Sequence, residues 1–261
     1  IVLSFTNFNL LQMPVFVGLD NYRKLLLNDN IFITAVKNTF VIAVITGPIG
    51  YLLSFLMAWL INELPRKIRA ILTIVFYAPS ISGNVYLIFV IIFSGDPYGY
   101  LNAKLLDWGF IDKAILWLQD TRYMIPIVVI VSLWMSLGFG FLSFVAGLQT
   151  VDKTQYESAA IDGIRNRWQE LWYITLPNMK PQLMFGAVMS ITSSLGVGDI
   201  TVALMGFPST NYAAHTIVNH LNDYGSIRME MGYASSVAVV LFAIMMLSNR
   251  LVQKFLKRVG T

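Results

Sequence analysis

The stretch IFITAVKNTFVIAVITGPIGYLLSFLMAWL, residues 31–60, contains a single charged residue, Lys37. A helix rises about 1.5 Å per residue, so a helix of this length exceeds the roughly 30 Å hydrocarbon core of a bilayer. Across the whole chain, 56% of the residues are hydrophobic and only 12% are charged, whereas about a quarter of the residues of a soluble domain are charged. Because a helix satisfies its own backbone polar groups in lipid, these features predict an all-α membrane protein.

Outward from this stretch, further apolar runs alternate with short charged patches. We predict five membrane spans, at residues 31–60, 68–94, 124–148, 182–205 and 231–253. The opening IVLSF is typical of the end of a spanning helix, so a sixth, truncated N-terminal helix is expected, with residues missing upstream. The predicted domain organisation is an outer segment with the end of this helix (1–30), a polytopic transmembrane domain (31–253) and a cytoplasmic tail (254–261).

The basic residues predict the orientation of these spans. On one side lie eleven of the 18 Lys and Arg residues: Arg66, Lys67, Arg69, Lys153, Arg165, Arg167, Lys180, Arg250, Lys254, Lys257 and Arg258. On the other side lie Arg23, Lys24, Lys37, Lys104, Lys113, Arg122 and Arg228. Since cytoplasmic loops carry the excess of basic residues, the first side is predicted to be cytoplasmic. The basic surplus then reflects topology and does not indicate a nucleic-acid partner.

On the outer side, the connection at residues 95–124 places Leu101, Leu105, Trp108, Ile115 and Leu118 at helix-like spacing. This spacing predicts amphipathic helices lying at the membrane interface.

A second outer segment, at residues 206–230, is predicted to form a short surface or re-entrant helix. It carries both histidines of the chain, His215 and His220. Five positions apart, they do not share a helix face as two metal ligands would, and we expect them to contact an external partner. No metal site is predicted, and the absence of cysteine excludes disulfides and thiolate metal sites.

Between the third and fourth spans, residues 150–181 form a polar, cytoplasmic insert. Asp152 or Thr154 can cap a helix, with Glu157 completing a capping box after Thr154, and Gly163 can end that helix in the left-handed conformation. A second helix with an apolar face of Trp168, Leu171 and Trp172 is predicted to stop before Pro177. The sequence thus predicts a two-helix elbow, although a well-capped connector without a partner would show the same pattern.

The elbow contains an ordered series of residues: Glu157, Ser158, Ala159, Asp162, Gly163, Ile174, Leu176, Pro177 and Pro181. In this series it resembles the EAA loop of binding-protein-dependent ABC importer permeases of the carbohydrate-uptake type. Further similar segments are FVGLDNYRKLL, GDITVALMGFP and MGYASSVAVVLF. The chain departs from the family pattern at Ser158, where Ala is usual, and at Gly198 and Gly206-Phe207-Pro208. Ten residues, 164–173, separate Gly163 from Ile174, where the pattern has nine.

The resemblance implies the transmembrane domain of a type I ABC importer in a bacterial plasma membrane. The elbow would be a coupling helix that inserts into a groove of a cytoplasmic ATPase, with Glu157 as polar anchor, Ala159 and Gly163 allowing close approach, and Leu176-Pro177 fixing the exit. Ser158 and Asp162 belong to the same motif. The implied partners are an ATPase dimer, a second permease, an extracytoplasmic solute-binding protein and membrane lipid. ATP and Mg would be held by the ATPase, with no cofactor on this chain.

Within the predicted spans, weakly polar stripes suit a path for neutral, hydroxyl-rich solutes. One stripe combines Ser190, Ser193, Ser194 and Val197; others include Ser136 and Asn84. Asp199 is the only acid well inside a predicted span, which makes it a functional candidate. For every one of these residues, helix packing or bonding to the preceding turn is the alternative, and Asp199 can instead cap a broken helix.

The predicted function is therefore that of a permease subunit that imports a sugar or oligosaccharide by alternating access, driven by ATP. No Walker A motif occurs in the sequence, so ATP hydrolysis is assigned to a separate subunit. The alternative is an ATP-independent carrier or channel, which would call for mid-membrane ionisable residues or an inverted repeat. An intramembrane enzyme would need a catalytic cluster, and the sequence shows none.

Overall fold

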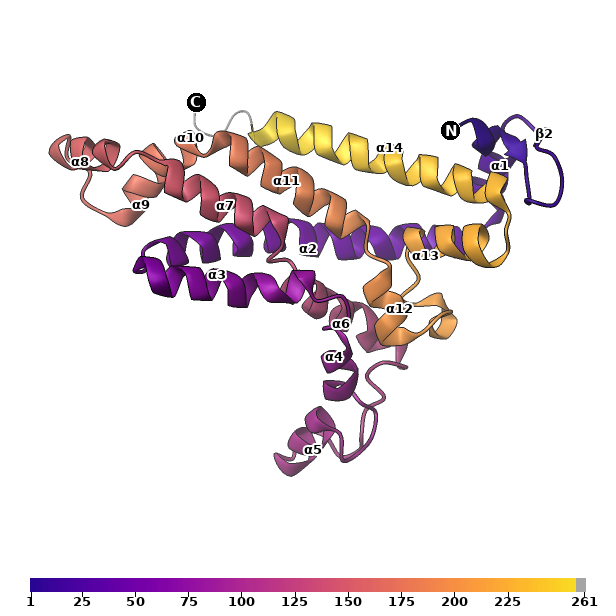
Figure 1. The fold of residues 1–261 in the computed structure, drawn as a ribbon. Coiled ribbons are helices and arrows are strands. Elements are labelled where there is room, and N and C mark those ends of the chain that lie inside the picture. The colour runs from indigo at the N-terminus through magenta and orange to yellow at the C-terminus, as the bar shows by residue number, and fades with distance from the viewer. Residues whose placement is uncertain (257–261) are drawn as a thin grey trace. The chain divides into compact units, whose positions relative to one another are not determined.

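The computed structural model describes residues 1–256, apart from the side chain of Phe139. Residues 257–261 of the predicted tail lie outside this range. Within it the chain forms α1 (Asp20–Arg23), α2 (Asn30–Asn62), α3 (Arg66–Ile81), α4 (Leu87–Ile92), α5 (Tyr100–Asp107), α6 (Thr121–Trp134), α7 (Phe139–Thr150), α8 (Lys153–Ile161), α9 (Arg167–Glu170), α10 (Leu176–Asn178), α11 (Lys180–Leu195), α12 (Asp199–Met205), α13 (Ile217–Asn222) and α14 (Met231–Leu256) (Figure 1).

Shorter elements complete the description. A 3-10 turn at Val2–Phe5 leads into two antiparallel strands, β1 (Thr6–Asn7) and β2 (Val15–Phe16), which the sequence analysis did not predict. A second 3-10 turn lies at Thr210–Tyr212, and π-helical turns lie at Lys24–Asn28, Leu171–Thr175 and Asp223–Ile227.

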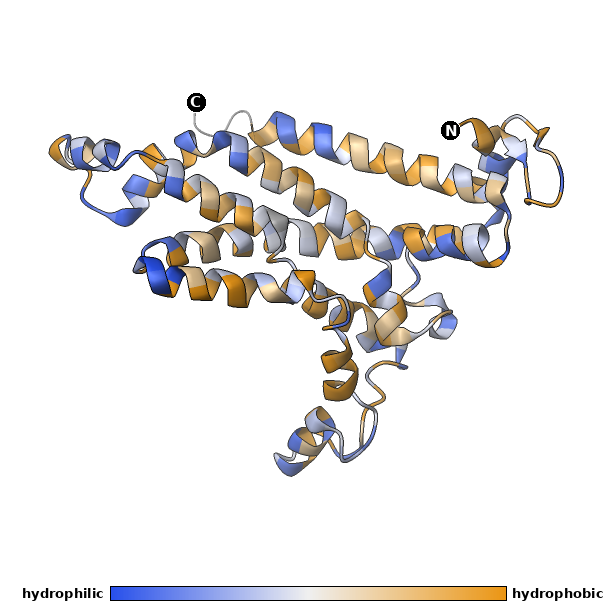
Figure 2. Cartoon of the chain, viewed as in Figure 1, coloured by the Kyte–Doolittle hydropathy of each residue, from blue (hydrophilic) through white to orange (hydrophobic). Residues whose placement is uncertain are grey.

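The predicted all-α class is confirmed. Among residues 1–256, three helical stretches are long and apolar enough to cross a membrane: Asn30–Asn62, Lys180–Met205 and Met231–Leu256. Figure 2 shows α2 and α14 coloured mainly as hydrophobic, with the connection between α2 and α3 strongly hydrophilic.

The second and third predicted spans are interrupted in the structure. α3 ends at Ile81, two residues after Pro79, and residues 82–86 separate it from α4. α6 ends at Trp134, and α7 begins only after Gly138, whose backbone is not helical (φ −103°, ψ −140°). The fourth predicted span breaks between α11 and α12, at residues 196–198, two of which are glycines.

The outer connection at residues 95–124 forms one helix of its own, α5, before α6 begins at Thr121, whereas more than one was predicted. The reason is the buried side chain of Asn102, whose amide nitrogen donates to the backbone oxygens of Ser94, Asp96 and Ile115. Its side-chain oxygen accepts from the backbone N–H of Ile115 and the indole of Trp117. The Asn102 side chain bonds backbone groups on both sides of α5 and so holds the segment after α5 in a non-helical conformation.

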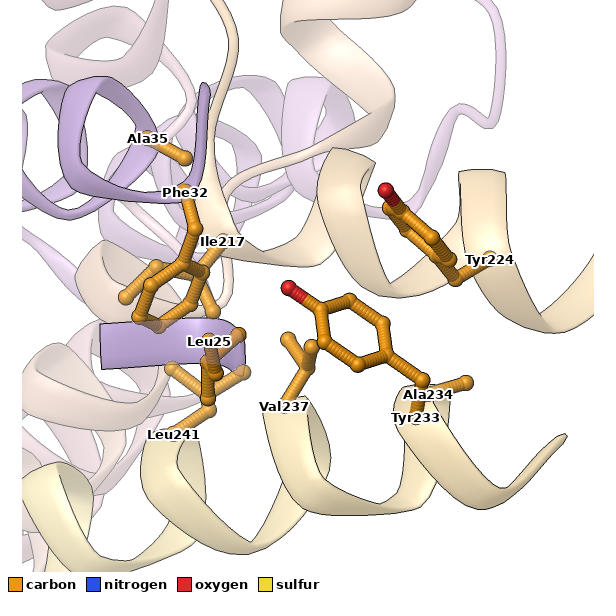
Figure 3. Packing of buried hydrophobic residues seen from close by; sticks show 9 residues of the cluster. All are labelled: Leu25, Phe32, Ala35, Ile217, Tyr224, Tyr233, Ala234, Val237 and Leu241. Carbon is orange, nitrogen blue, oxygen red and sulfur yellow. The ribbon is translucent and has the colours of Figure 1, made fainter. Parts of the chain in front are cut away.

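The chain divides into two compact units. The first comprises Ile1–Ile45, Asn84–Ser132 and Ser194–Met245. Its core gathers side chains from α2, α13, α14 and the two neighbouring π-helical turns: Leu25, Phe32, Ala35, Ile217, Tyr224, Tyr233, Ala234, Val237 and Leu241 (Figure 3). The rings of Tyr224 and Tyr233 lie 4.4 Å apart by centroid.

His215 and His220 belong to the interior of this first unit, which corrects the expectation that they contact an external partner. Each side chain is only 1% exposed. Thr216 caps α13 by accepting from the backbone N–H of Asn219, and this cap directs the preceding His215 back towards His220. The two rings pack edge to face, and further aromatic rings surround them, including Phe32, Tyr212 and Tyr224.

The second unit comprises Thr46–Gly83, Leu133–Ser193 and the C-terminal part of α14. Its core lies between α2, α7 and α11 and contains Ala58, Ile61, Phe141, Phe144, Val145, Leu148, Met179 and Leu183. α2 presents small residues to its neighbours at helical spacing, namely Gly47, Gly50, Ser54 and Ala58. The hydroxyl of Ser54 donates to the backbone oxygen of Ser136, and a Cβ added at Gly50 would lie 2.9 Å from that of Ser136. Small residues thus allow close helix packing here.

Candidate functional site

The elbow at residues 150–181 lies within the second unit, where α8 and α9 extend beyond the ends of α7 and α11 (Figure 1). Its first helix, α8, is capped by Asp152, whose carboxylate accepts from the backbone N–H of Thr154 at 3.0 Å. Of the two predicted caps, Asp152 is the one formed. The hydrogen bonds from Thr154 hold the pKa of the Asp152 carboxyl below its usual value. The cap thus favours the ionised form, as is usual at the N-terminus of a helix.

Gly163 ends α8 in the left-handed region with φ +96°, as predicted. The backbone N–H of Ile164 donates to the oxygen of Ala159 at 3.0 Å, and that of Gly163 to Ala160 at 3.4 Å. This pair of bonds is the Schellman motif, which satisfies the last carbonyls of a helix. A Cβ added at Gly163 would meet no atom within 4 Å. Its backbone conformation, and not crowding inside the chain, therefore calls for glycine.

The second arm of the elbow begins with a cap that the sequence analysis missed. The side chain of Asn166 accepts from the backbone N–H of Gln169 at 2.8 Å, and the side chain of Gln169 in turn accepts from the N–H of Arg165 at 3.0 Å. The signal was present in the sequence, because Asn followed three residues later by Gln matches a capping box.

The prediction that this arm stops before Pro177 is wrong. Helical structure continues from α9 through a π-helical turn at Leu171–Thr175 into α10, which includes Pro177. Proline lacks an N–H and its ring crowds the carbonyl four residues earlier, and the wider π-helical turn relieves both problems. The hydroxyl of Thr175 also donates to the backbone oxygen of Glu170 at 3.3 Å.

The predicted apolar face of this arm is only partly correct. Leu171 is 7% exposed and Ile174 is also 7% exposed, whereas Trp168 and Trp172 are 66% and 63% exposed. The two tryptophans therefore lie on the outer face of the arm, and the aliphatic residues face inward.

Two side-chain bonds join the arms of the elbow. The hydroxyls of Tyr156 and Thr175 lie 2.9 Å apart, and the Thr175 side chain is 2% exposed. The amide nitrogen of Asn178 donates both to the Gln155 side chain at 2.6 Å and to the backbone oxygen of Ile174 at 2.8 Å. These bonds between residues far apart in the sequence make the elbow one body, which a floppy loop would not be.

The predicted coupling residues lie mainly on the surface of this body. Glu157, Ser158 and Asp162 are exposed, and the Glu157 carboxylate has no hydrogen-bond or ion-pair partner within residues 1–256. The hydroxyl of Ser158 donates to the backbone oxygen of Thr154. Ala159 is 8% exposed and belongs to the inner face of α8. Ile161 at the tip is 88% exposed, so the outer surface of α8 combines a free carboxylate with an uncovered apolar side chain.

The exit of the elbow is anchored in the core of the second unit. Leu176 packs against the cluster formed by α2, α7 and α11, as does Val151 at the entrance. Pro177 is half-buried at the start of α10. The entrance and the exit of the elbow, here called its two roots, therefore pack against the same apolar cluster.

A further contact ties the elbow to the connection between α2 and α3. Arg167 forms ion pairs with Glu63 at 2.9 Å and with Glu170 at 2.8 Å. The hydrogen bond to Glu170 and the charge of Glu63 raise the pKa of the Arg167 guanidinium. The rings of Trp59 and Trp168 lie 5.4 Å apart by centroid.

Two of the predicted substrate-path residues take part in packing within the second unit. The Ser190 hydroxyl donates to the backbone oxygen of Gly47 on α2 at 2.7 Å, which joins α11 to α2. The Ser136 hydroxyl donates to Leu133 in the preceding turn at 2.7 Å. Ser193 is exposed and donates to the backbone oxygen of Ser190 at 3.1 Å. Ser193 is thus the exposed one of these three residues, whereas Ser190 and Ser136 are half-buried.

The remaining path candidates belong to the first unit. Ser194 and Val197 are 9% and 6% exposed, and the backbone oxygen of Val197 accepts from the Thr216 hydroxyl. Asp199 is exposed and is the first residue of α12, but the capping position is occupied by Gly198 and Asp199 forms no side-chain cap. Asn84 is exposed and accepts from the Tyr86 hydroxyl at 3.3 Å. Among the residues that the structure describes, no group of three metal-ligating side chains occurs.

Comparison with known proteins gives consistent matches. Residues 50–261 match the family model described as binding-protein-dependent transport system inner membrane component. The probable ABC transporter permease protein YesP of Bacillus subtilis is 30% identical over 248 residues, which cover 93% of this chain and 78% of YesP. The arabinooligosaccharides transport system permease protein AraP of Bacillus subtilis is 30% identical over 233 residues, which cover 88% of this chain and 73% of AraP.

A solved structure shares the fold. It is a chain of a bacterial alginate ABC transporter, crystallised in complex with an alginate pentasaccharide-bound periplasmic protein. The TM-score is 0.75 at 26% sequence identity, and the alignment covers 92% of this chain and 84% of that chain.

Proposed function

Since the chain belongs to the family of binding-protein-dependent transport system inner membrane components, we propose that it is the permease subunit of an ATP-driven importer for a sugar or oligosaccharide. In this role it receives the solute from an extracytoplasmic binding protein and releases it into the cytoplasm by alternating access. The carbohydrate class is supported by relatives named for arabinooligosaccharide transport and by the alginate transporter.

The observation that carries the proposal is the construction of the elbow. Both arms are capped, the arms are bonded to each other, and both roots rest on the core of α2, α7 and α11. A force applied to α8 would therefore reach the membrane helices as a rigid-body displacement. The free carboxylate of Glu157 and the uncovered Ile161 are the features expected of a surface that binds another protein.

The proposed partners follow from this role. A cytoplasmic ATPase dimer binds α8 and holds ATP and Mg, a second permease completes the path, and a solute-binding protein docks on the outer segments. No cofactor is proposed for this chain. For the substrate path, the exposed Ser193 and Asp199 are retained as candidates for contact with the solute, whereas Ser190 and Ser136 are assigned to helix packing.

Co-purification tests the proposal. The affinity-tagged chain is isolated from native membranes in mild detergent, and co-purified protein is assayed for ATP hydrolysis and identified by mass spectrometry. We expect an ATPase with the unmodified chain and at least tenfold less of it with Glu157→Arg, because reversal of a charge at an interface costs more than about 1.4 kcal/mol.

Asp107→Arg is the matched control, because Asp107 is an exposed acid on α5, in the predicted outer segment. It should leave the yield of ATPase unchanged. Uptake that persists after ATP depletion but collapses with the ion gradient would instead establish the secondary carrier.

A further inference from the structure

The connection between α2 and α3 carries one acid among basic residues. Glu63 is the only acid in residues 61–70, which also contain Arg66, Lys67 and Arg69. Its carboxylate pairs with Arg167 on the second arm of the elbow, with Nη2 and Oε2 2.9 Å apart. Glu63 thus pairs with an arginine far from it in the sequence, although three basic residues lie close to it along the chain.

A second contact lies beside the first. Trp59 lies in the last turn of α2, four positions before Glu63, and its ring packs on that of Trp168, the residue after Arg167. The two rings lie 5.4 Å apart by centroid with 46° between their planes. Two neighbouring contacts between the same two segments fix their relative orientation as well as their distance.

Arg167 is itself held in place. Its Nη1 donates to Glu170 at 2.8 Å while Nη2 faces Glu63, so one guanidinium bridges two carboxylates. The planar fork of arginine suits such bridging, which a lysine ammonium does with less orientation. Arg167 and Glu63 are 64% and 41% exposed, and exposed ion pairs add little to folding stability. The contact is therefore better suited to orienting two segments than to stabilising the fold.

We propose that Glu63 and Trp59 latch the α2–α3 connection onto Arg167 and Trp168 of the elbow, so that a displacement of the elbow moves α2 and α3 together with α7 and α11. This inference rests on the proposed function, in which an ATPase displaces the elbow. Glu63 and Arg167 are then positioning residues for transport. They act on the helices and have no contact with ATP or solute.

Distance measurements in the assembled transporter test the latch. The chain contains no cysteine, so spin labels can be placed on Lys67→Cys and Lys153→Cys, two exposed positions in the first turns of α3 and α8. The distance between the labels is measured without nucleotide and with ATP under conditions that block hydrolysis. With Glu63 and Arg167 intact, we expect the same distance distribution in both states.

Variants then open the latch. Glu63→Gln and Arg167→Gln should give a broadened distribution that differs between the two states, while ATPase co-purification stays within about twofold of the parent, since the outer surface of α8 is unaltered. Arg167→Lys keeps the charge and should restore most of the single distribution. Glu170→Gln is the matched control, because it removes an acid from Arg167 but leaves Glu63 in place.

The outcomes separate the two proposals. If the unmodified chain does not assemble with an ATPase, the proposed function fails. If it assembles and hydrolyses ATP, but the label distance changes by more than a few ångströms when ATP binds, the latch alone is refuted. The latch is also refuted if Glu63→Gln and Arg167→Gln leave the distances unchanged in both states.

Discussion

The imidazole rings of His215 and His220 face each other in the first unit, with Nε2 of His215 and Nδ1 of His220 3.4 Å apart and both side chains buried. On its other side, Nε2 of His220 lies 3.2 Å from the Asp29 carboxylate, in an orientation that does not form a hydrogen bond. Asp29 is fixed by hydrogen bonds from the Tyr233 hydroxyl and the backbone N–H of Phe32. Asp223 pairs with Arg228, and its negative charge favours the protonated form of both histidines.

This arrangement predicts a pH-dependent stability. Burial, followed by repulsion from His220, lowers the pKa of His215 to about 4, and burial lowers that of His220 in spite of Asp29. Because the unfolded chain binds these protons more tightly than the folded chain, stability falls as the pH drops below about 6.5. For His215 alone the loss between pH 7 and pH 5 is about 2 kcal/mol. Thermal unfolding in detergent should therefore occur several degrees lower at pH 5.

The chain has only these two histidines, so the range between pH 5 and pH 7 reports mainly on them. His215→Gln should flatten the pH dependence, even if it lowers the melting temperature at pH 7. An equally steep dependence in that variant would contradict the assignment. Although burial on its own would raise the pKa of Asp29, the hydrogen bonds from Tyr233 and Phe32 hold it below its usual value, so its contribution is lost only in more acidic solution.

A second prediction concerns the left-handed Gly163. Replacement by alanine should cost about 1–2 kcal/mol, because a Cβ disfavours this backbone conformation. We expect faster hydrogen exchange at the N–H of Ile164, which closes the Schellman motif, and roughly fivefold less co-purified ATPase. Gly163→Asn is the matched comparison, since Asn tolerates left-handed backbone better than Ala. If alanine and asparagine behave alike, the backbone explanation is wrong.

A third prediction concerns the packing of α7 against α11. A Cβ at Gly186 would collide with the ring of Phe144, which is fully buried. Gly186→Ala should therefore destabilise the second unit by about 1–3 kcal/mol, the usual range for overpacking. The melting temperature in detergent should fall accordingly. Adding Phe144→Leu should recover part of the loss by giving the new methyl group room.

Gly83→Ala serves as the control for that series, because a Cβ at Gly83 would meet no atom within 4 Å. Its melting temperature should stay close to that of the parent. A Gly186→Ala variant that melted like Gly83→Ala would show that the two helices separate easily.

A fourth prediction distinguishes the two serines of α11. Ser190→Ala removes the bond to Gly47 and should lower stability by about 1 kcal/mol, the usual net value of one hydrogen bond, without changing the apparent KM for uptake. Ser193→Ala should leave stability unchanged and raise KM if its hydroxyl contacts the solute. Uptake by the reconstituted transporter and thermal unfolding check both. A raised KM at Ser190 with unaltered melting would reverse the assignment.

The sequence predicted those features that rest on local chemistry. The all-α class followed from charge-poor runs, and the end of α8 followed from Gly163, because glycine alone adopts that conformation easily. The break between α11 and α12 falls at residues 196–198, where two glycines give the backbone unusual freedom. By contrast, the break before α7 lies in an apolar run whose only glycines nearby are Gly138 and Gly140. Apolarity predicts that a segment is long enough to span a membrane but does not predict that its helix is continuous.

Other features depend on contacts that no local pattern encodes. His215 and His220 looked like surface residues because their segment is polar, yet Phe32 and Tyr224 from other elements bury them. The pairing of Glu63 with Arg167 joins segments far apart in the sequence. The small residues of α2 contact Ser136 and Ser190, which lie far from them in the sequence, so these contacts emerge only from the fold.

The π-helical turn at Leu171–Thr175 overlaps the segment whose length departs from the EAA-loop pattern that the elbow resembles. Residues 164–173 between Gly163 and Ile174 number one more than the family pattern has, and a π-helical turn takes up one extra residue within a helix. The insertion is absorbed locally, so Ile174 still faces inward and Leu176 still meets the core. The extra residue thus widens one helical turn and leaves the ends of the arm in place. Deletion of one residue from this turn should therefore yield an ordinary α-helical arm in which Leu176 still packs against the same cluster.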